Sequence, residues 1–160
     1  MNCEIRPITP DEIPLLQDFL YEAIYQPDED HLLPRSVINQ PEIRVFIDDF
    51  GRKDDHCLVA LADGKIIGAV WARILSGDIK GFGNIDDQTP EFAISVYKPY
   101  RGKGIGTQLM RRMLRLLKEN GYAKASLAVQ KDNYAVKMYQ DVGFVVIGEN
   151  DEEYIMVYAF

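Results

Sequence analysis

One stretch of the sequence decides the fold: Glu91-Phe-Ala-Ile-Ser-Val96-Tyr-Lys-Pro-Tyr-Arg101-Gly-Lys-Gly104-Ile-Gly106-Thr-Gln-Leu-Met110. It predicts a strand, a short basic turn with three alternating glycines, and a long helix that begins there. The first backbone N–H groups of a helix have no partner within the helix, and the helix dipole favours an anion at that end. Glycines without β-carbons let phosphate oxygens approach those N–H groups. The stretch therefore predicts a pyrophosphate-binding turn.

Two familiar phosphate-binding loops do not fit this turn. A P-loop requires Ser or Thr directly after Gly-Lys, whereas Gly104 and Ile105 stand there. A dinucleotide-binding GxGxxG motif counted from Gly102 would need glycine at Thr107, and no acidic residue near position 124 is available to hold a ribose. The alternative that remains is a tight helix start whose glycines serve packing alone.

Hydrophobic periodicity and turn residues place further elements around the stretch. Strands are expected at Cys3–Ile8, His56–Ala62, Lys65–Leu75, Glu91–Val96, Ala125–Val129, Phe144–Gly148 and Tyr154–Phe160. Helices are expected from Pro10 to Ile24, at Pro41–Phe50, Gly104–Asn120 and Asn133–Val142, with a shorter one at Arg35–Asn39. This order mixes hairpins with crossover helices, so we expect a mixed, partly antiparallel sheet with helices on both faces, in one domain over residues 1–160.

Composition narrows the class of function. The net charge of −7 argues against nucleic-acid binding, which needs a basic face. Between Lys98 and Lys124, however, eight basic residues face one acidic residue, and an anionic ligand would favour that region. Two cysteines and two histidines are too few for a zinc site or a disulfide framework, so we expect no metal. The chain has neither an apolar stretch of ~20 residues nor a secretion signal, which predicts a cytoplasmic protein without membrane contact.

The stretch resembles the signature of the GNAT superfamily of N-acetyltransferases, Arg/Gln-x-x-Gly-x-Gly/Ala, which begins a helix after a strand. Here Arg101, Gly104 and Gly106 match it, and the resemblance continues through Val129–Asn133 and Tyr139–Phe144. It implies an α/β (α+β) fold with a mostly antiparallel twisted sheet of about seven strands, splayed between the fourth and fifth strands. It also implies acetyl-CoA as co-substrate and an amine-bearing small molecule or peptide as acceptor, in a monomer or homodimer.

The resemblance further implies which residues contact the cofactor. The backbone of Ile94, Ser95 and Val96 would pair with the pantetheine arm. The pyrophosphate would be held by the turn and the helix start, which comprise Arg101, Gly102, Lys103, Gly104, Ile105, Gly106 and Thr107. An asparagine usually stands seven residues before the family's tyrosine, but here Asp132 has that spacing and Asn133 is one residue short. The pantetheine contact is assigned to Asn133, and either residue could cap the helix.

Transfer of an acetyl group from a thioester to an amine poses two proton problems. The amine, with an ordinary pKa of ~10.4, must lose a proton before it attacks, and the departing thiolate must gain one. The resemblance puts the Tyr139 hydroxyl near the sulfur, so Tyr139 is the candidate acid, against the alternative of a core tyrosine. Glu91 is the candidate base, directly or through a water, against the alternative of a solvent-facing glutamate. Neither cysteine is required as a nucleophile.

Acceptor selection is expected from the less recognisable part of the chain. Candidates are Tyr21, Tyr25, His31, Phe46, Trp71, Arg73 and the loop Gly77–Gln88, although Trp71 and the tyrosines are more often core or packing residues than part of a substrate site. Asp78, Asp86 and Asp87 in that loop could attract a cationic amine. Two further functions remain open: a non-catalytic acyl-CoA-binding module or sensor, and an acetylase of protein termini or lysines.

Overall fold

The computed structural model describes residues 3–160, and seven strands within that range form one sheet in the order β1-β2-β3-β4-β5-β7-β6. The strands are β1 (Glu4–Pro7), β2 (His56–Ala62), β3 (Lys65–Arg73), β4 (Glu91–Val96), β5 (Lys124–Gln130), β6 (Val145–Glu149) and β7 (Glu153–Ala159). Neighbouring strands are antiparallel except β4 and β5, which are parallel. This confirms the expected mixed, mostly antiparallel sheet.

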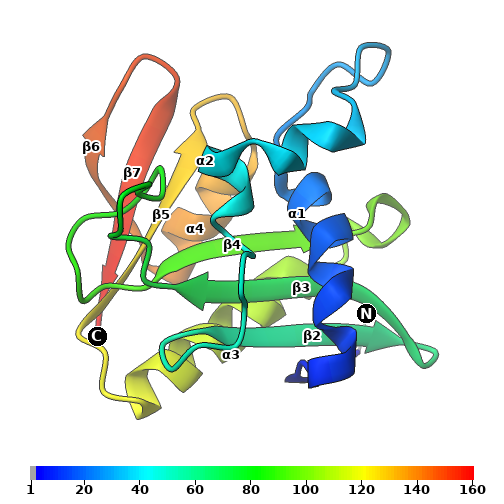
Figure 1. Ribbon diagram of the computed structural model, residues 1–160, viewed down its shortest axis with the longest axis horizontal. Helices are drawn as coiled ribbons and strands as arrows, with labels where there is room; N and C mark the ends of the chain where they lie inside the picture. The colour runs from blue at the N-terminus through cyan, green and yellow to red at the C-terminus, as the bar shows by residue number, and fades with distance from the viewer. Residues whose placement is uncertain (1–2) are drawn as a thin grey trace.

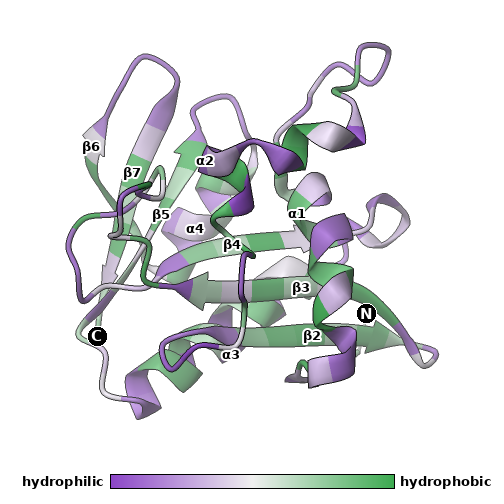
Figure 2. Cartoon of the chain, in the orientation of Figure 1, coloured by the Kyte–Doolittle hydropathy of each residue, from purple (hydrophilic) through white to green (hydrophobic). Residues whose placement is uncertain are grey.

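Helices cover both faces of the sheet (Figure 1). They are η1 (Pro10–Leu15), α1 (Leu16–Ala23), η2 (Arg35–Asn39), α2 (Pro41–Arg44), η3 (Lys98–Tyr100), α3 (Ile105–Glu119) and α4 (Ala135–Val142). One core lies between the sheet and α3 with α4, and the other lies between the sheet and α1 with η2. Figure 2 shows that the central strands β2, β3 and β4 are mainly hydrophobic, whereas the surrounding loops are mainly polar.

The splay between the fourth and fifth strands follows from how little they pair. Glu91 and Ser126 are the one residue pair joining β4 to β5 among residues 3–160. Figure 1 shows the two strands running apart from that junction. β5 pairs along its whole length with β7 on its other side. The backbone of β4 beyond Glu91 therefore has no β5 partner.

Two helices differ from the expectation. The helix expected from Pro10 to Ile24 is a 3₁₀ helix up to Leu15 and an α-helix only from Leu16, because Pro14 lacks the N–H that an α-helix interior needs. The helix expected at Pro41–Phe50 is α-helical only to Arg44. The hairpin turn after β2 has positive φ at Asp63 and Gly64, as its dipeptide predicted.

Candidate active site

The amino end of α3 is built to accept an anion. Gly104 precedes the helix with φ 81° and Gly102 has φ 74°, a left-handed conformation that glycine adopts without strain. No side chain caps this end and no acidic residue stands in the first turn. A β-carbon at either glycine would meet no atom within 4 Å. The first N–H groups of α3 therefore lie beside open space, the arrangement that an anion at a helix start requires.

Arg101 connects this turn to the end of β4. Its Nε donates to the backbone oxygen of Val96 at 2.7 Å, and its Nη2 donates to Glu22 of α1 at 3.1 Å. The guanidinium thus orients the turn relative to the strand, and Glu22 balances part of its charge. Ile105 anchors the helix start in the core with 1% of its surface exposed, whereas Gly102, Lys103 and Gly104 are exposed. Gly106 and Thr107 are half-buried in the first turn of α3.

β4 carries its side chains alternately into the two cores. The Ser95 hydroxyl donates to the backbone oxygen of Phe19 in α1 at 2.7 Å, so it lies on the α1 face. Val96 and the half-buried Ile94 pack into the core beside α3. Because β5 has left β4 at this point, the edge of these three residues has no neighbouring strand, and a ligand can pair with its backbone groups other than the Val96 oxygen, which is bonded to Arg101.

Glu91 lies at the junction of β4 and β5 and is almost completely buried, with 2% of its surface exposed. Its Oε2 accepts a hydrogen bond from the backbone N–H of Gly83 at 2.9 Å. Burial raises the pKa of this carboxyl group to about 7 against the lowering effect of the Gly83 bond, and Glu153 raises it further. A carboxyl group with this pKa exchanges protons near neutral pH.

The loop between β3 and β4 covers Glu91. A β-carbon at Gly81 would overlap Oε1 of Glu91, and one at Gly83 would lie 2.5 Å from the backbone carbonyl carbon of Leu127 in β5. The two glycines therefore let the loop lie directly on the junction. The sequence predicts a role for this loop in acceptor selection but not its contact with Glu91, for which the Gly81-Phe82-Gly83 pattern was the available signal.

Tyr139 lies in α4 and is buried, with 8% of its surface exposed. Its ring contacts Phe144 edge-on at a centroid distance of 6.1 Å. Burial raises its pKa above the ordinary value, so the hydroxyl stays protonated at neutral pH.

At the start of the same helix, Oδ1 of Asn133 accepts a hydrogen bond from the backbone N–H of Ala135 at 2.9 Å. Asn133, and not the exposed Asp132, is therefore the one of the two whose side chain bonds to the amino end of α4.

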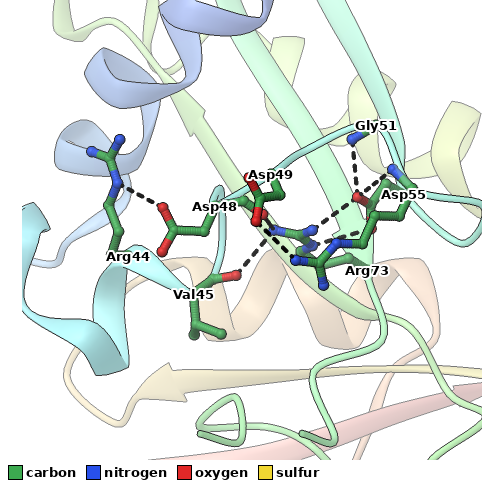
Figure 3. A network of polar contacts seen from close by, with 8 residues as sticks. Arg44, Val45, Asp48, Asp49, Gly51, Asp55 and Arg73 are labelled. Carbon is green, nitrogen blue, oxygen red and sulfur yellow. Dashed lines mark hydrogen bonds and ion pairs between the residues drawn. The ribbon is translucent and has the colours of Figure 1, made fainter.

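Two acceptor candidates lie in the interior. Arg73 has 2% of its surface exposed, and its guanidinium forms a two-bond ion pair with Asp55 at 2.9 and 3.1 Å (Figure 3). It also donates to the backbone oxygens of Val45 and Asp48. Trp71, 1% exposed, donates from its indole N–H to the backbone oxygen of Phe46. These contacts hold the segment after α2 against β3.

Other acceptor candidates lie in α1 or in the segments that follow α1 and α2. The Tyr25 hydroxyl donates to the backbone oxygen of Asp132 at 3.1 Å and so joins the segment after α1 to the segment after β5. Tyr21 donates to the backbone oxygen of Leu33, and His31 pairs with Asp28. Phe46 is buried and stacks on Phe82, a half-exposed side chain of the loop over Glu91.

Residues 3–160 include no helix long and apolar enough to cross a membrane. No group of three or more His, Cys, Asp or Glu residues within this range is placed to hold a metal ion.

Comparison with known proteins identifies the family. A model of the acetyltransferase (GNAT) family matches residues 19–144. A SPbeta prophage-derived uncharacterized N-acetyltransferase of Bacillus subtilis, YokL, is 25% identical over 151 residues, which are 92% of this chain and 78% of that protein. N-acetylaspartate synthetase of Xenopus tropicalis is 35% identical over 92 residues, 56% of this chain but only 31% of that protein.

Solved structures agree on the fold. PaiA N-acetyltransferase from Thermoplasma acidophilum, solved in complex with coenzyme A, has a TM-score of 0.70 at 20% identity, and the match covers 100% of both chains. The family match spans most of the sequence and includes the glycine turn, the β4–β5 junction and Tyr139. The chain therefore belongs to the GNAT family of acetyltransferases.

Proposed function

We propose that this protein transfers an acetyl group from acetyl-CoA to a primary amine of a small molecule or peptide, by direct attack within a ternary complex. The observation that carries the proposal is the uncapped amino end of α3, which follows β4 through a turn with two positive-φ glycines. Family membership and the splay beside β4 support the same function.

Acetyl-CoA supplies an activated thioester, so the chain needs no covalent intermediate of its own. The N–H groups of the first turn of α3, with Arg101 and Lys103 nearby, would bind the pyrophosphate. The free edge of β4 at Ile94–Val96 would pair with the amide groups of the pantetheine arm, much as a strand would. Asn133 uses its side-chain oxygen to cap α4, which leaves its amide N–H₂ as the group available to a ligand.

The two titratable side chains divide the proton transfers. Tyr139 would donate its proton to the departing thiolate. Burial makes the phenol a weaker acid, but a thiolate formed in the same desolvated surroundings is a stronger base by the same physical effect. Glu91, with a pKa of about 7, would accept the proton that the acceptor ammonium loses. A buried, nearly uncompensated carboxyl group of this kind favours an enzyme over a non-catalytic acyl-CoA sensor, which needs no base.

Calorimetric titration with coenzyme A tests the binding turn. Gly104→Asp adds bulk and negative charge where the pyrophosphate would lie, and we expect affinity to fall about 100-fold, the loss of two charge-assisted hydrogen bonds. Gly64→Asp is the matched control, because Gly64 also has positive φ and open space around it but lies in the β2–β3 hairpin. Equal affinity of both variants for coenzyme A would refute the proposed turn.

The acetyl-transfer step is tested by free-thiol release from acetyl-CoA over a panel of amines that includes amino acids, polyamines, peptides with free amino termini or lysines, and folded proteins. Thiol release that depends on both enzyme and amine is the expected result. Binding of acetyl-CoA without release for any amine would support the sensor, and release with folded protein substrates alone would support the protein acetylase.

A further inference from the structure

Two buried oxygen atoms mark the junction of β4 and β5. Among the side chains of residues 3–160, Oε1 of Glu91 and Oγ of Ser126 are the buried polar atoms without a hydrogen-bond partner. Glu91 is 2% exposed and Ser126 is fully buried. Buried polar atoms are rarely left without partners, because each costs the free energy of its lost hydration. Two such atoms in one place therefore indicate a ligand common to both.

The register of the sheet brings these two residues together. Glu91 and Ser126 are Cα partners, and paired residues of neighbouring strands project from the same face of a sheet. This face is the α1 side of the sheet. Ser95 projects from the same face of β4 as Glu91, because the two are an even number of positions apart, and its hydroxyl bonds to Phe19 of α1. Leu127, next to Ser126 in β5, packs into the core on the opposite, α3 side. The two unpartnered oxygens thus lie side by side on one face, but beyond hydrogen-bond distance of each other.

The covering loop prevents Glu91 from acting alone. The backbone N–H of Gly83 donates a hydrogen bond to Oε2 of Glu91. Gly81 lies so close to Oε1 that a β-carbon on Gly81 would overlap this oxygen. An acceptor amine that carries any substituent cannot approach the carboxylate through this loop. A proton therefore reaches Oε1 of Glu91 through a carrier smaller than the amine.

We propose that Ser126 is a positioning residue for deprotonation of the acceptor: its hydroxyl and Oε1 of Glu91 together hold the water molecule that passes the amine's proton to Glu91. This inference rests on the proposed function. A water molecule has two donors and two acceptors, so it satisfies both orphaned oxygens and still contacts the amine.

The proton transfer balances without any further reactant. The N–H bond of the ammonium breaks, and its electron pair stays on nitrogen, which becomes the nucleophile. The water oxygen gains that proton and releases one of its own to Oε1 of Glu91. Glu91 ends as a neutral carboxylic acid, which its apolar surroundings favour, and Ser126 keeps its proton throughout.

The charged groups around Glu91 are consistent with this role. Glu153 of β7 disfavours the carboxylate through its negative charge. Arg73 is the Cα partner of Glu91 in β3, but its guanidinium is bound to Asp55. Gly81-Phe82-Gly83 and Ser126 bring no charge. No cation therefore competes with the transferred proton for Oε1 among these neighbours.

The first test needs no activity. The carboxyl carbon of Glu91 is followed by ¹³C NMR against pH in the wild type, Ser126→Ala and Ser95→Ala. Loss of the bridging water removes a hydrogen bond to the carboxylate form, so Ser126→Ala should raise the pKa of Glu91 by about one unit. Ser95→Ala is the matched control, a buried serine of the same face whose hydroxyl is already bonded, and it should leave that pKa unchanged. An unchanged Glu91 pKa in Ser126→Ala overturns the proposal.

The second test uses the reaction. With an amine identified by the thiol-release panel, Ser126→Ala should lower kcat about tenfold below pH 7, with a smaller loss above pH 9 where more amine is neutral, and an unchanged KM for acetyl-CoA. A loss of kcat equal at all pH values would mean a structural role and would overturn the proposal. Should the wild type transfer acetyl to no amine, the proposed function fails, whereas the NMR titration still decides whether Ser126 and Glu91 share a water.

Discussion

Replacement of Glu91 by glutamine should change how the stability of this protein depends on pH. The pKa of Glu91 is raised from 4.5 to about 7 in the folded protein, chiefly by burial. Between these values the folded chain holds a proton that the unfolded chain has lost, so folding is favoured at low pH and this contribution disappears as pH rises through 7. A shift of about 2.5 units corresponds to about 3 kcal/mol.

We therefore expect the wild type to lose about 3 kcal/mol more than Glu91→Gln between pH 4.5 and pH 8.5, equivalent to a relative melting shift of about 6–12 °C for a chain of this size. Glutamine stays neutral at both pH values, and the comparison of the two pH values cancels any fixed cost of the new amide.

Urea unfolding followed by circular dichroism at both pH values measures this difference. Glu119→Gln, at the exposed end of α3, is the control, because it removes the same charge from solvent and should follow the wild type. Identical losses of unfolding free energy in the wild type and in Glu91→Gln would refute the conclusion that burial raises the pKa of Glu91 to about 7.

Three other variants test separate parts of the structure. Tyr139→Phe should lower kcat by about 10²-fold while coenzyme A affinity by calorimetry changes little, since only the proton donor is lost; wild-type kcat would contradict the acid role. Arg73→Met should cost about 3–5 kcal/mol in urea unfolding, because it leaves Asp55 buried without its partner, and a loss below 1 kcal/mol would contradict that burial. Gly83→Ala should lower stability by about 1–3 kcal/mol because its β-carbon meets the β5 backbone, whereas Gly77→Ala, with open space around it, should not; equal melting temperatures would refute the close loop contact.

The secondary structure was predictable where local chemistry decides it. The glycine turn, the helix after it, the Asp63-Gly64 hairpin and the positions of the seven strands along the chain all agree with the sequence-based expectation. The expected helix at Pro41–Phe50 fails after Arg44 for a tertiary reason. The backbone oxygens of Val45 and Asp48 bond to Arg73, which lies 25 or more residues away in β3 and pairs with Asp55. Periodicity within the segment contains no information about such a partner.

The candidate site was likewise predictable from the sequence only in part. The amino end of α3 could be assigned from the sequence because its N–H groups, its glycines and its helix all lie within a few residues of one another. Glu91 could be named as a residue of the right strand, but its partners could not. A serine inside the hydrophobic run Ala125–Val129 was a visible signal that nothing in the sequence connected to Glu91.

The glycine turn at the start of α3 and the alternation of strand side chains between the two faces of the sheet follow from the sequence alone, since both depend on neighbours in the chain. Only the tertiary structure decided the chemistry of the β4–β5 junction. There the crossover through α3 pairs Glu91 with Ser126, and the loop between β3 and β4 lies directly on Glu91 and on the backbone of β5. The protonation of a carboxyl group depends on the dielectric and the hydrogen bonds around it, and at Glu91 these come from segments that meet only when the sheet is assembled.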